Sequence, residues 1–340
     1  MKLIIEKQEG ILGMKKVAIV FNGGTISMRV DPKLQAAVPT LDGEQIMSMV
    51  TGIEEYAEIE TYTFSSLPSP HVTPKLMMEL SAYIQKLLNR EDIVGVVTTH
   101  GTDSLEETAY FLDLTLNSNK PVIVTGSMRN SSELGYDGPA NLAASICTAI
   151  SEEAKGRGVL VCLNDEINCA SEVTKEHSMH LNTFKSPEFG PVGIVDNNEA
   201  IFYRDNLNKQ KVLTDKIETK VDLIKAAAGM DGKFIDFAVS EGSKGIVIEA
   251  MGRGNLPPKM AEAVGRAMVK DVIVVMVSRC FKGRVLDSYG YKGGGKELRN
   301  SGVIFGDRLP GQKARIKLMV ALGKTTDKEE IRKIFEQNIY

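Results

Sequence analysis

Short, nearly continuous runs of branched apolar residues alternate along the first half of the chain with longer segments of helical periodicity. Such runs are typical of parallel strands that are covered on both faces of a sheet. The pattern predicts strands over Lys16–Phe21, Ile93–Thr98, Val122–Thr125 and Val159–Leu163, and helices over Gly43–Val50, Pro74–Asn89, Ser104–Leu116 and Gly138–Glu153. This alternation of strands and helices predicts an α/β fold with a doubly wound parallel sheet.

A smaller version of the same pattern follows residue 220. It predicts strands over Phe234–Val239, Gly245–Glu249 and Val272–Val277, and helices over Pro258–Val269, Arg315–Leu322 and Asp327–Gln337. Residues 201–219 are polar and poorly periodic, which is typical of a linker. We therefore predict a larger N-terminal domain over 14–200 and a smaller C-terminal α/β domain over 220–340. Residues 1–13 are interpreted as an alternative start or an extension.

Composition and charge narrow the class of protein. The chain has 340 residues, and 41 basic against 44 acidic residues leave a net charge of −3, so no positive field favours nucleic-acid binding. The sequence contains no run of 18 uncharged apolar residues, so no membrane span is predicted, and Met1–Gly10 does not resemble a signal peptide. The four cysteines lack the close pairing of a zinc site and indicate a reduced, cytoplasmic compartment. Three of them lie in apolar segments and are predicted to be buried: Cys147, Cys162 and Cys280.

Two motifs follow predicted strands at the edge where parallel sheets bind ligands. Asn22–Ile26 (NGGTI) presents Thr25 after two glycines, and Thr99–Ser104 (THGTDS) places the Thr102 hydroxyl beside the Asp103 carboxylate. Each motif alone is a weak signal, because a glycine pair often makes only a turn and Asp103 or Ser104 could cap the next helix. Neither a dinucleotide-binding GxGxxG nor a phosphate-binding GxxxxGK[ST] sequence is present.

The two motifs together resemble the two signatures of the bacterial-type L-asparaginases, the asparaginase–glutaminase family. The similarity continues in order through Pro121–Asn141, Gly158–Lys175, Thr183–Gly190, Gly252–Leu256 and Gln312–Arg315. It implies a flavodoxin- or Rossmann-like N-terminal domain and a cytoplasmic, type I-like member of the family. It also implies hydrolysis of L-asparagine to L-aspartate and ammonia through an acyl-enzyme, with no metal and no cofactor.

The resemblance also implies roles for individual residues. Thr25 matches the nucleophile, and an alcohol needs a base or a proton path to attack. Lys175 matches the lysine that works with Thr102, and Asp103 matches the residue that binds the substrate's α-ammonium group. The substrate-binding set carried over from the family comprises Gly24, Ser69, Gly101, Thr102, Asp103 and, from a neighbouring subunit, Asn255. The histidines near these motifs are interpreted as structural (His71, His100) or as surface residues (His177, His180).

Two positions depart from the family's pattern. Pro70 follows Ser69 where the family has a polar or acidic residue, which puts recognition of the α-amino group in question. The loop Ser27–Leu41 lacks the tyrosine that the family places on a mobile loop after the first motif. Three explanations of the missing tyrosine are open: another residue substitutes for it, the substrate differs from asparagine, or the activity is weak. We rank substitution first, with Tyr289 or Tyr291 reaching a partner's site.

Such a contribution from a neighbour implies a homodimer or a homotetramer. Three functions stay open at this point. The first is hydrolysis of asparagine or of another amide. The second is the ammonia-supplying subunit of a tRNA-dependent amidotransferase, which the short segment before the first strand disfavours. The third is a catalytically weak small-molecule binder, which the four residues Thr25, Thr102, Asp103 and Lys175 argue against.

Overall fold

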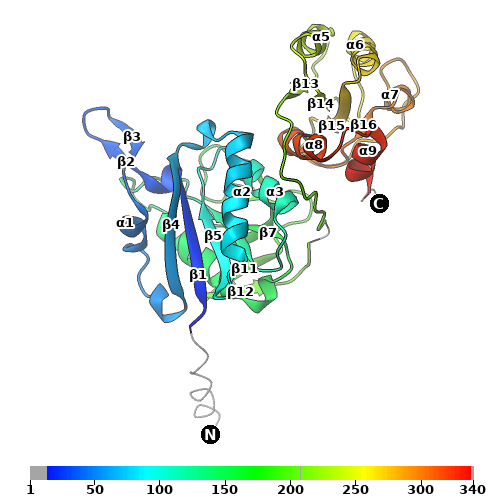
Figure 1. Cartoon of the computed structure of the whole chain (residues 1–340). Helices are drawn as coiled ribbons and strands as arrows, with labels where there is room; N and C mark the ends of the chain where they lie inside the picture. Colours follow the sequence, from blue (N-terminus) through cyan, green and yellow to red (C-terminus); the bar gives the residue numbers. More distant parts are fainter. Residues whose placement is uncertain (1–13, 207, 338–340) are drawn as a thin grey trace.

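The computed structural model describes residues 14–206 and 208–337, arranged as two α/β domains side by side (Figure 1). The predicted extension at residues 1–13 lies outside the described residues. The last strand of the N-terminal sheet ends at Phe202 and the first strand of the C-terminal sheet begins at Val221.

An eight-stranded sheet forms the centre of the N-terminal domain, in the order β12-β11-β8-β7-β6-β5-β1-β4. Five strands run parallel: β1 (Lys16–Gly23), β4 (Glu58–Leu67), β5 (Ile93–Thr99), β6 (Val122–Thr125) and β7 (Val159–Leu163). Three antiparallel strands extend the sheet: β8 (Glu166–Cys169), β11 (Gly193–Asp196) and β12 (Glu199–Phe202). The predicted parallel core is confirmed, whereas the antiparallel extension was not predicted.

Helices cover both faces of this sheet, as predicted. α2 (Pro74–Leu88) and α3 (Leu105–Thr115) pack on the face that receives Ala18 and Val20 of β1. α1 (Gly43–Met47) and α4 (Gly138–Ile150) pack on the opposite face, which receives Val17 and Ile19. The alternation within β1 follows from the period of two in a strand, and both faces are apolar because both are covered.

The order of the strands creates a ligand-binding position beside β1. The chain passes from β1 to β4 on one side and then returns through α2 to β5 on the other side. The helices that follow β1 and β4 therefore lie on opposite faces of the sheet. Ligands of doubly wound sheets bind at such a switch point, outside the carboxyl ends of the strands. The segments that follow β1 and β5 carry the two motifs.

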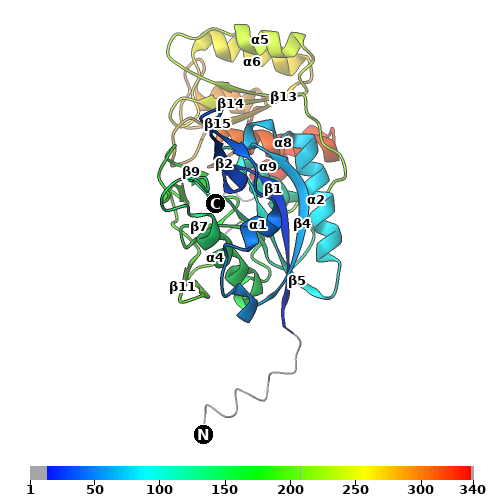
Figure 2. The ribbon, with the colours of Figure 1, turned by 90° about the vertical axis from the view of Figure 1, so that its left-hand side faces the viewer.

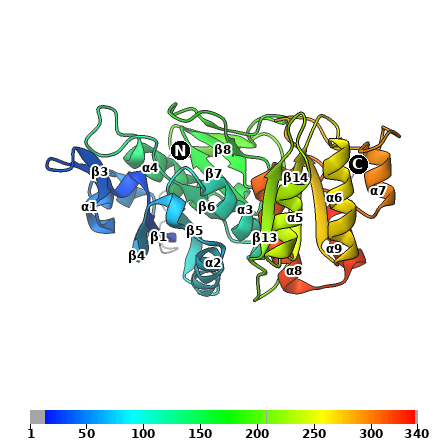
Figure 3. The ribbon, with the colours of Figure 1, turned by 90° about the horizontal axis from the view of Figure 1, so that it is seen from above.

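The C-terminal domain has a four-stranded parallel sheet: β13 (Val221–Lys225), β14 (Gly245–Ala250), β15 (Ile273–Ser278) and β16 (Ile304–Phe305). Figure 2 shows α5 (Lys233–Ser240) and α6 (Pro258–Val269) on its outer face, and α8 (Gly311–Lys324) and α9 (Lys328–Glu336) beneath it. The short helix α7 (Gly295–Asn300) lies at the end remote from β1 (Figure 3). Two small hairpins complete the described strands: β2 (Met28–Asp31) with β3 (Ala36–Pro39), and β9 (Thr174–Lys175) with β10 (Phe184–Lys185).

Two predictions about local structure are corrected. Phe234–Val239 is helical within α5, because Ile235 and Ala238, three residues apart, are buried while Phe234 and Phe237 are exposed. A short apolar run cannot distinguish these cases by itself. Cys280 is exposed, since it lies beyond the end of β15, whereas Cys147 and Cys162 are buried as predicted. The strands β4 and β13 were not predicted, because exposed polar residues interrupt their apolar pattern.

The two domains share an apolar core. Tyr110, Phe111 and Leu114 of α3 belong to one buried cluster with Ala314 and Leu318 of α8. α3 therefore packs between the large sheet and the C-terminal domain, and this contact fixes the domains relative to each other. In the part of the chain that the structure describes, no helix has the length and apolarity required to cross a membrane.

Helix α8 also buries a lysine with no anionic partner in contact. Lys317 is 3% exposed, its Nζ lies 4.9 Å from the centre of the Phe335 ring, and it has no ion pair with any described residue. Burial lowers the pKa of Lys317 to about 7, although Asp307 opposes part of this effect. Between that pKa and the ordinary value of 10.5, the unfolded chain binds more protons than the folded chain. The free energy of unfolding must therefore rise with pH in this window.

We expect Lys317→Met to raise the free energy of unfolding at pH 7 by about 1–4 kcal/mol, because it removes the cost of burying a charge. The variant should also lose the part of the rise in stability between pH 7 and 10 that Lys317 contributes, while the buried Lys313, whose pKa is lowered to about 8, keeps its own part. Urea unfolding of both proteins at several pH values measures both effects. A variant that is less stable than the wild type at every pH would contradict this account of Lys317.

Candidate functional site

The turn after β1 presents Thr25 at the carboxyl edge of the sheet. Gly24 has φ 85° and ψ −177°, a conformation essentially restricted to glycine. Its N–H donates to Leu67 O at 3.0 Å, and its carbonyl accepts from Ser27 N at 3.0 Å. Thr25 begins a turn of 3-10 helix, is partly exposed, and its hydroxyl has no hydrogen bond to a described residue. The hydroxyl is therefore free to meet a ligand.

The second motif packs directly against this turn. A methyl group on Gly24 would lie 2.3 Å from Gly101 N, and one on Gly101 would lie 2.8 Å from the Ser69 side chain. Such separations are possible only because both positions lack a Cβ atom. The glycines thus bring three segments far apart in sequence together around Thr25, Ser69 and Thr102.

Lys175 connects the second motif to hairpin β9–β10. Its Nζ donates to Thr102 Oγ1 at 3.0 Å and to Asp103 Oδ1 at 2.8 Å. The Lys175 side chain is 14% exposed, whereas that of Asp103 is 65% exposed. Because Thr102 accepts from the lysine, its own proton remains available to donate. A hydroxyl, an amine and an accessible carboxylate therefore meet at one place.

Ser69 joins this group through the backbone of the second motif. Its Oγ accepts from Asp103 N at 3.2 Å, and its carbonyl accepts from Ser104 Oγ at 2.9 Å. Ser69 is buried, and because its Oγ accepts from Asp103 N, its own proton remains available to donate. The neighbouring Pro70 and His71 are exposed.

His100 has a structural arrangement, in line with its interpretation from the sequence. It is fully enclosed, and burial lowers its pKa, so the ring is neutral near pH 7. Nδ1–H donates to Gly101 O at 2.8 Å, which leaves Nε2 to accept from the Thr108 hydroxyl at 2.9 Å. Both ring nitrogens are used in holding the turn. His177 and His180 are exposed and stack on each other with 3.6 Å between ring centres.

A tyrosine that was not among the predicted site residues lies beside the Thr25 turn. Tyr136 donates its hydroxyl to Ile26 O at 2.6 Å. Ser131 N donates to Met28 O at 3.0 Å, and Val30 N donates to Ser132 Oγ at 3.0 Å. The segment before α4 therefore holds the β2–β3 hairpin, which occupies the loop that lacks a tyrosine. Burial raises the pKa of Tyr136, so its phenol stays protonated.

Asn255 and Tyr289 lie in the C-terminal domain, whereas Thr25 lies in the N-terminal domain. Tyr289 is 43% exposed and precedes α7 in the chain, and α7 is the helix at the end of the molecule opposite β1 (Figure 3). Asn255 Oδ1 is buried without a hydrogen-bond partner among the described residues. Neither side chain is hydrogen-bonded to Thr25, Thr102 or Lys175 in the described part of the chain. The single chain therefore does not bring the whole predicted set together.

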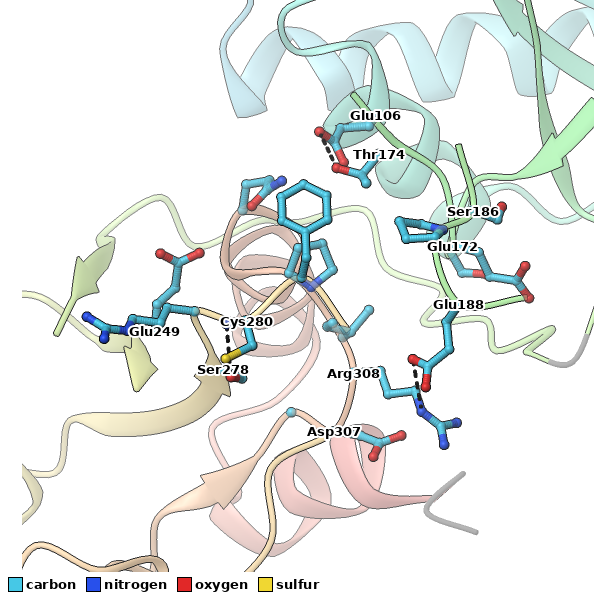
Figure 4. A pocket seen from close by; sticks show the side chains of 18 of the residues that line it. Glu106, Glu172, Thr174, Ser186, Glu188, Glu249, Ser278, Cys280, Asp307 and Arg308 are labelled. Atoms are coloured by element: carbon cyan, nitrogen blue, oxygen red, sulfur yellow. Dashed lines mark hydrogen bonds and ion pairs between the residues drawn. The ribbon is translucent and has the colours of Figure 1, made fainter. Parts of the chain in front are cut away.

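A cavity of about 350 Å³ opens between the domains behind Lys175. Figure 4 shows Glu106 and Thr174 on its N-terminal side, hydrogen-bonded to each other, and Glu249 with Cys280 on its C-terminal side. Of the predicted catalytic residues, Lys175 lines this cavity, whereas Thr25, Thr102 and Asp103 do not. Among the described residues, no group of three or more histidines, cysteines or carboxylates could hold a metal ion.

Comparisons with known proteins agree over nearly the whole chain. The N-terminal asparaginase family model matches residues 16–208, and the glutaminase/asparaginase C-terminal domain model matches residues 220–335. An L-asparaginase of Bacillus licheniformis is 38% identical over 308 residues, which are 91% of this chain and 95% of that protein. A probable L-asparaginase of Deinococcus radiodurans is 36% identical over 331 residues, which are 96% of this chain and 99% of that protein.

One solved structure gives the same result in three dimensions. The crystal structure of a probable cytoplasmic L-asparaginase from Campylobacter jejuni superposes with a TM-score of 0.83 at 32% identity. The match covers 94% of this chain and 99% of that chain. Sequence and fold therefore point to one family.

Proposed function

Since the chain belongs to the asparaginase and glutaminase family of amidohydrolases, we propose that it hydrolyses L-asparagine to L-aspartate and ammonia. The observation that carries the proposal is the junction of Lys175 with Thr102 and Asp103 beside the Thr25 turn. This arrangement provides a hydroxyl nucleophile, a proton path and a substrate anchor at the switch point of the sheet.

Thr25 is the nucleophile in this proposal. Its Oγ attacks the side-chain amide carbon and forms an ester, while the amide nitrogen leaves as ammonia after taking up a proton. Water then hydrolyses the ester and regenerates the threonine. The free hydroxyl of Thr25 and its place at the tip of β1 support this role.

Thr102 and Lys175 form the proton path. Lys175 Nζ donates to Thr102 Oγ1, and Thr102 can donate onward to a substrate or a water molecule. Tyr136 is a poor candidate for the missing loop tyrosine, because its proton is held by Ile26 O and its role is to support the turn. We keep Tyr289 of a neighbouring subunit as the proposed substitute.

The substrate's charged ends have matching groups. The second carboxylate oxygen of Asp103, not used by Lys175, can bind the α-ammonium group, and Ser69 can donate to the α-carboxylate. The backbone of Gly24 and Gly101 lies close enough to this position to contact the substrate, since neither carries a side chain. No step requires a cofactor.

The proposed active form is a cytoplasmic homodimer or homotetramer. Its site takes Asn255 and Tyr289 from a neighbouring subunit. The exposed Tyr289 and the partly exposed Asn255 support this arrangement, because both side chains have surface left to contact a neighbouring chain. The C-terminal domain would then complete the site of its partner rather than that of its own chain.

The test of the proposed function is ammonia release from L-asparagine, L-glutamine, D-asparagine and longer amides. We expect the wild type to release ammonia from L-asparagine and the Thr25→Ala protein to release none. If only another amide is hydrolysed, the asparagine assignment fails while amidohydrolase chemistry stands. If no amide is hydrolysed, the small-molecule binder of the same fold becomes the better interpretation.

Shared sites predict that two defective chains complement each other. We expect Asn255→Ala and Thr25→Ala to be poorly active when each is expressed alone. Co-expression with two different tags yields mixed oligomers, some of which pair an intact Thr25 with an intact Asn255. Ammonia release by the doubly purified mixture should therefore exceed that of either variant. Equal activity would place Asn255 outside a shared site.

A further inference from the structure

Lys313 of the C-terminal domain is fully buried, yet its amine is used by the N-terminal domain. It has 0% exposure and lies in the first turn of α8. Its Nζ donates to Ala170 O at 2.8 Å and to Val173 O. These two carbonyls belong to the segment that leads directly into Lys175. A charged amine from the second domain thus holds the chain just before the predicted proton relay.

Glu106 makes the complementary contacts from the other side. It lies in the first turn of α3, three residues after Asp103. Its Oε1 accepts from Thr174 Oγ1 at 3.2 Å and from Lys175 N at 3.5 Å. Its Oε2 has no hydrogen bond among the described residues, and Lys313 Nζ lies 3.9 Å away as its counter-charge.

A continuous chain of contacts therefore runs from α8 to the reacting groups. Lys313 holds the backbone at 170–173 and balances the charge of Glu106. Glu106 accepts from the Thr174 hydroxyl and from the backbone N–H of Lys175, and Lys175 Nζ reaches Thr102. A buried ion pair is a costly way to gain stability, so its presence at this place calls for another reason.

We infer that Lys313 and Glu106 are a pair of positioning residues that fix Lys175 against Thr102, so that the C-terminal domain controls the geometry of the proton path. This inference rests on the proposed function and deepens it. Neither residue touches the substrate position. Both act through Lys175, and small displacements of a relay group are enough to reduce turnover strongly.

The chain offers a matched pair of substitutions on one helix. Lys313→Met and Lys317→Met each remove one buried lysine from α8, one turn apart, but only Lys313 contacts the 170–175 segment and Glu106. Glu106→Gln tests the other partner. A glutamine has one NH₂ group in place of one carboxylate oxygen. Whichever way the amide turns, this donor faces another donor, either the Lys313 amine or the Lys175 N–H, so one of the two contacts is lost.

Two measurements separate positioning from simple stability. We expect Lys313→Met and Glu106→Gln to lower kcat for L-asparagine by about 100-fold with a smaller change in KM. Lys317→Met should keep the wild-type kcat. Trace labelling with acetic anhydride, read by mass spectrometry, should show faster modification of Lys175 in the first two variants, because its side chain leaves Thr102 and Asp103. It should show no change in Lys317→Met.

The labelling result decides the inference independently of turnover. Unchanged labelling of Lys175 in folded Lys313→Met and Glu106→Gln proteins would overturn it. If the wild type releases no ammonia, the proposed function fails, while labelling still tells whether the pair fixes Lys175. If Lys313→Met does not fold, Glu106→Gln alone gives the answer, since it keeps the volume of the side chain.

Discussion

Thr25→Ala is expected to lower kcat for L-asparagine by about 1,000-fold or more while leaving the fold intact, because it removes the atom that forms the acyl-enzyme. The Thr25 hydroxyl makes no hydrogen bond to a described residue, so its loss leaves no buried group unpaired. Thr102→Ala should lower kcat by about 100-fold or more, since it breaks the proton path to Lys175. Ammonia release and urea unfolding of each variant measure both expectations.

Two substitutions serve as controls for this prediction. Thr25→Ser keeps a hydroxyl at the same position and should retain part of the activity. Thr40→Ala removes an exposed hydroxyl at the base of the β2–β3 hairpin but keeps the backbone bond from Thr40 N to Ser27 O, so it should leave kcat unchanged. If Thr25→Ala keeps near-wild-type turnover, Thr25 is not the nucleophile and the reaction must begin elsewhere.

The sequence predicted the central strands because burial on both faces leaves an uninterrupted apolar run. Val17–Val20 is such a run, and its alternate residues enter two different cores. Strands with one exposed face did not stand out in the same way. β4 alternates polar and apolar residues, and β13 has an exposed aspartate and leucine, so neither was recognised. The short run Phe234–Val239 suited both a strand and a helix, and only tertiary packing decides between them.

The candidate site was predicted through its motifs, but its supporting residues were not. Thr25, Thr102 and Asp103 follow strands that become neighbours, so their meeting is a consequence of sheet order that local sequence does not contain. Lys313 appears as an ordinary helical lysine in the sequence, because burial of a charge depends on the carbonyls and the carboxylate that surround it. Tyr136 was overlooked for a similar reason, since its partner Ile26 lies 110 positions away.

The contact between the two glycine turns carries the second large effect. We expect Gly24→Ala to lower the free energy of unfolding by about 3 kcal/mol or more and to abolish most ammonia release. A methyl group there would approach the Gly101 backbone to 2.3 Å, and the φ of 85° is unfavourable for any residue with a Cβ atom. Since Gly101 directly precedes Thr102, relief of the clash must separate Thr25 from the proton path. Urea unfolding measures the loss of stability, and the rate of ammonia release by the folded protein measures the loss of activity.

Gly52→Ala separates backbone strain from the clash between the turns. Gly52 has a φ of 82° but no atom within 4 Å of an added methyl group, so its replacement should cost only the left-handed conformation, about 1 kcal/mol. Its activity should stay at the wild-type level because Gly52 lies far from the site in the chain and supports none of its contacts. If Gly24→Ala costs no more stability than Gly52→Ala and still turns over asparagine, the two turns can move apart freely. Their close approach would then not be what holds Thr25 beside Thr102.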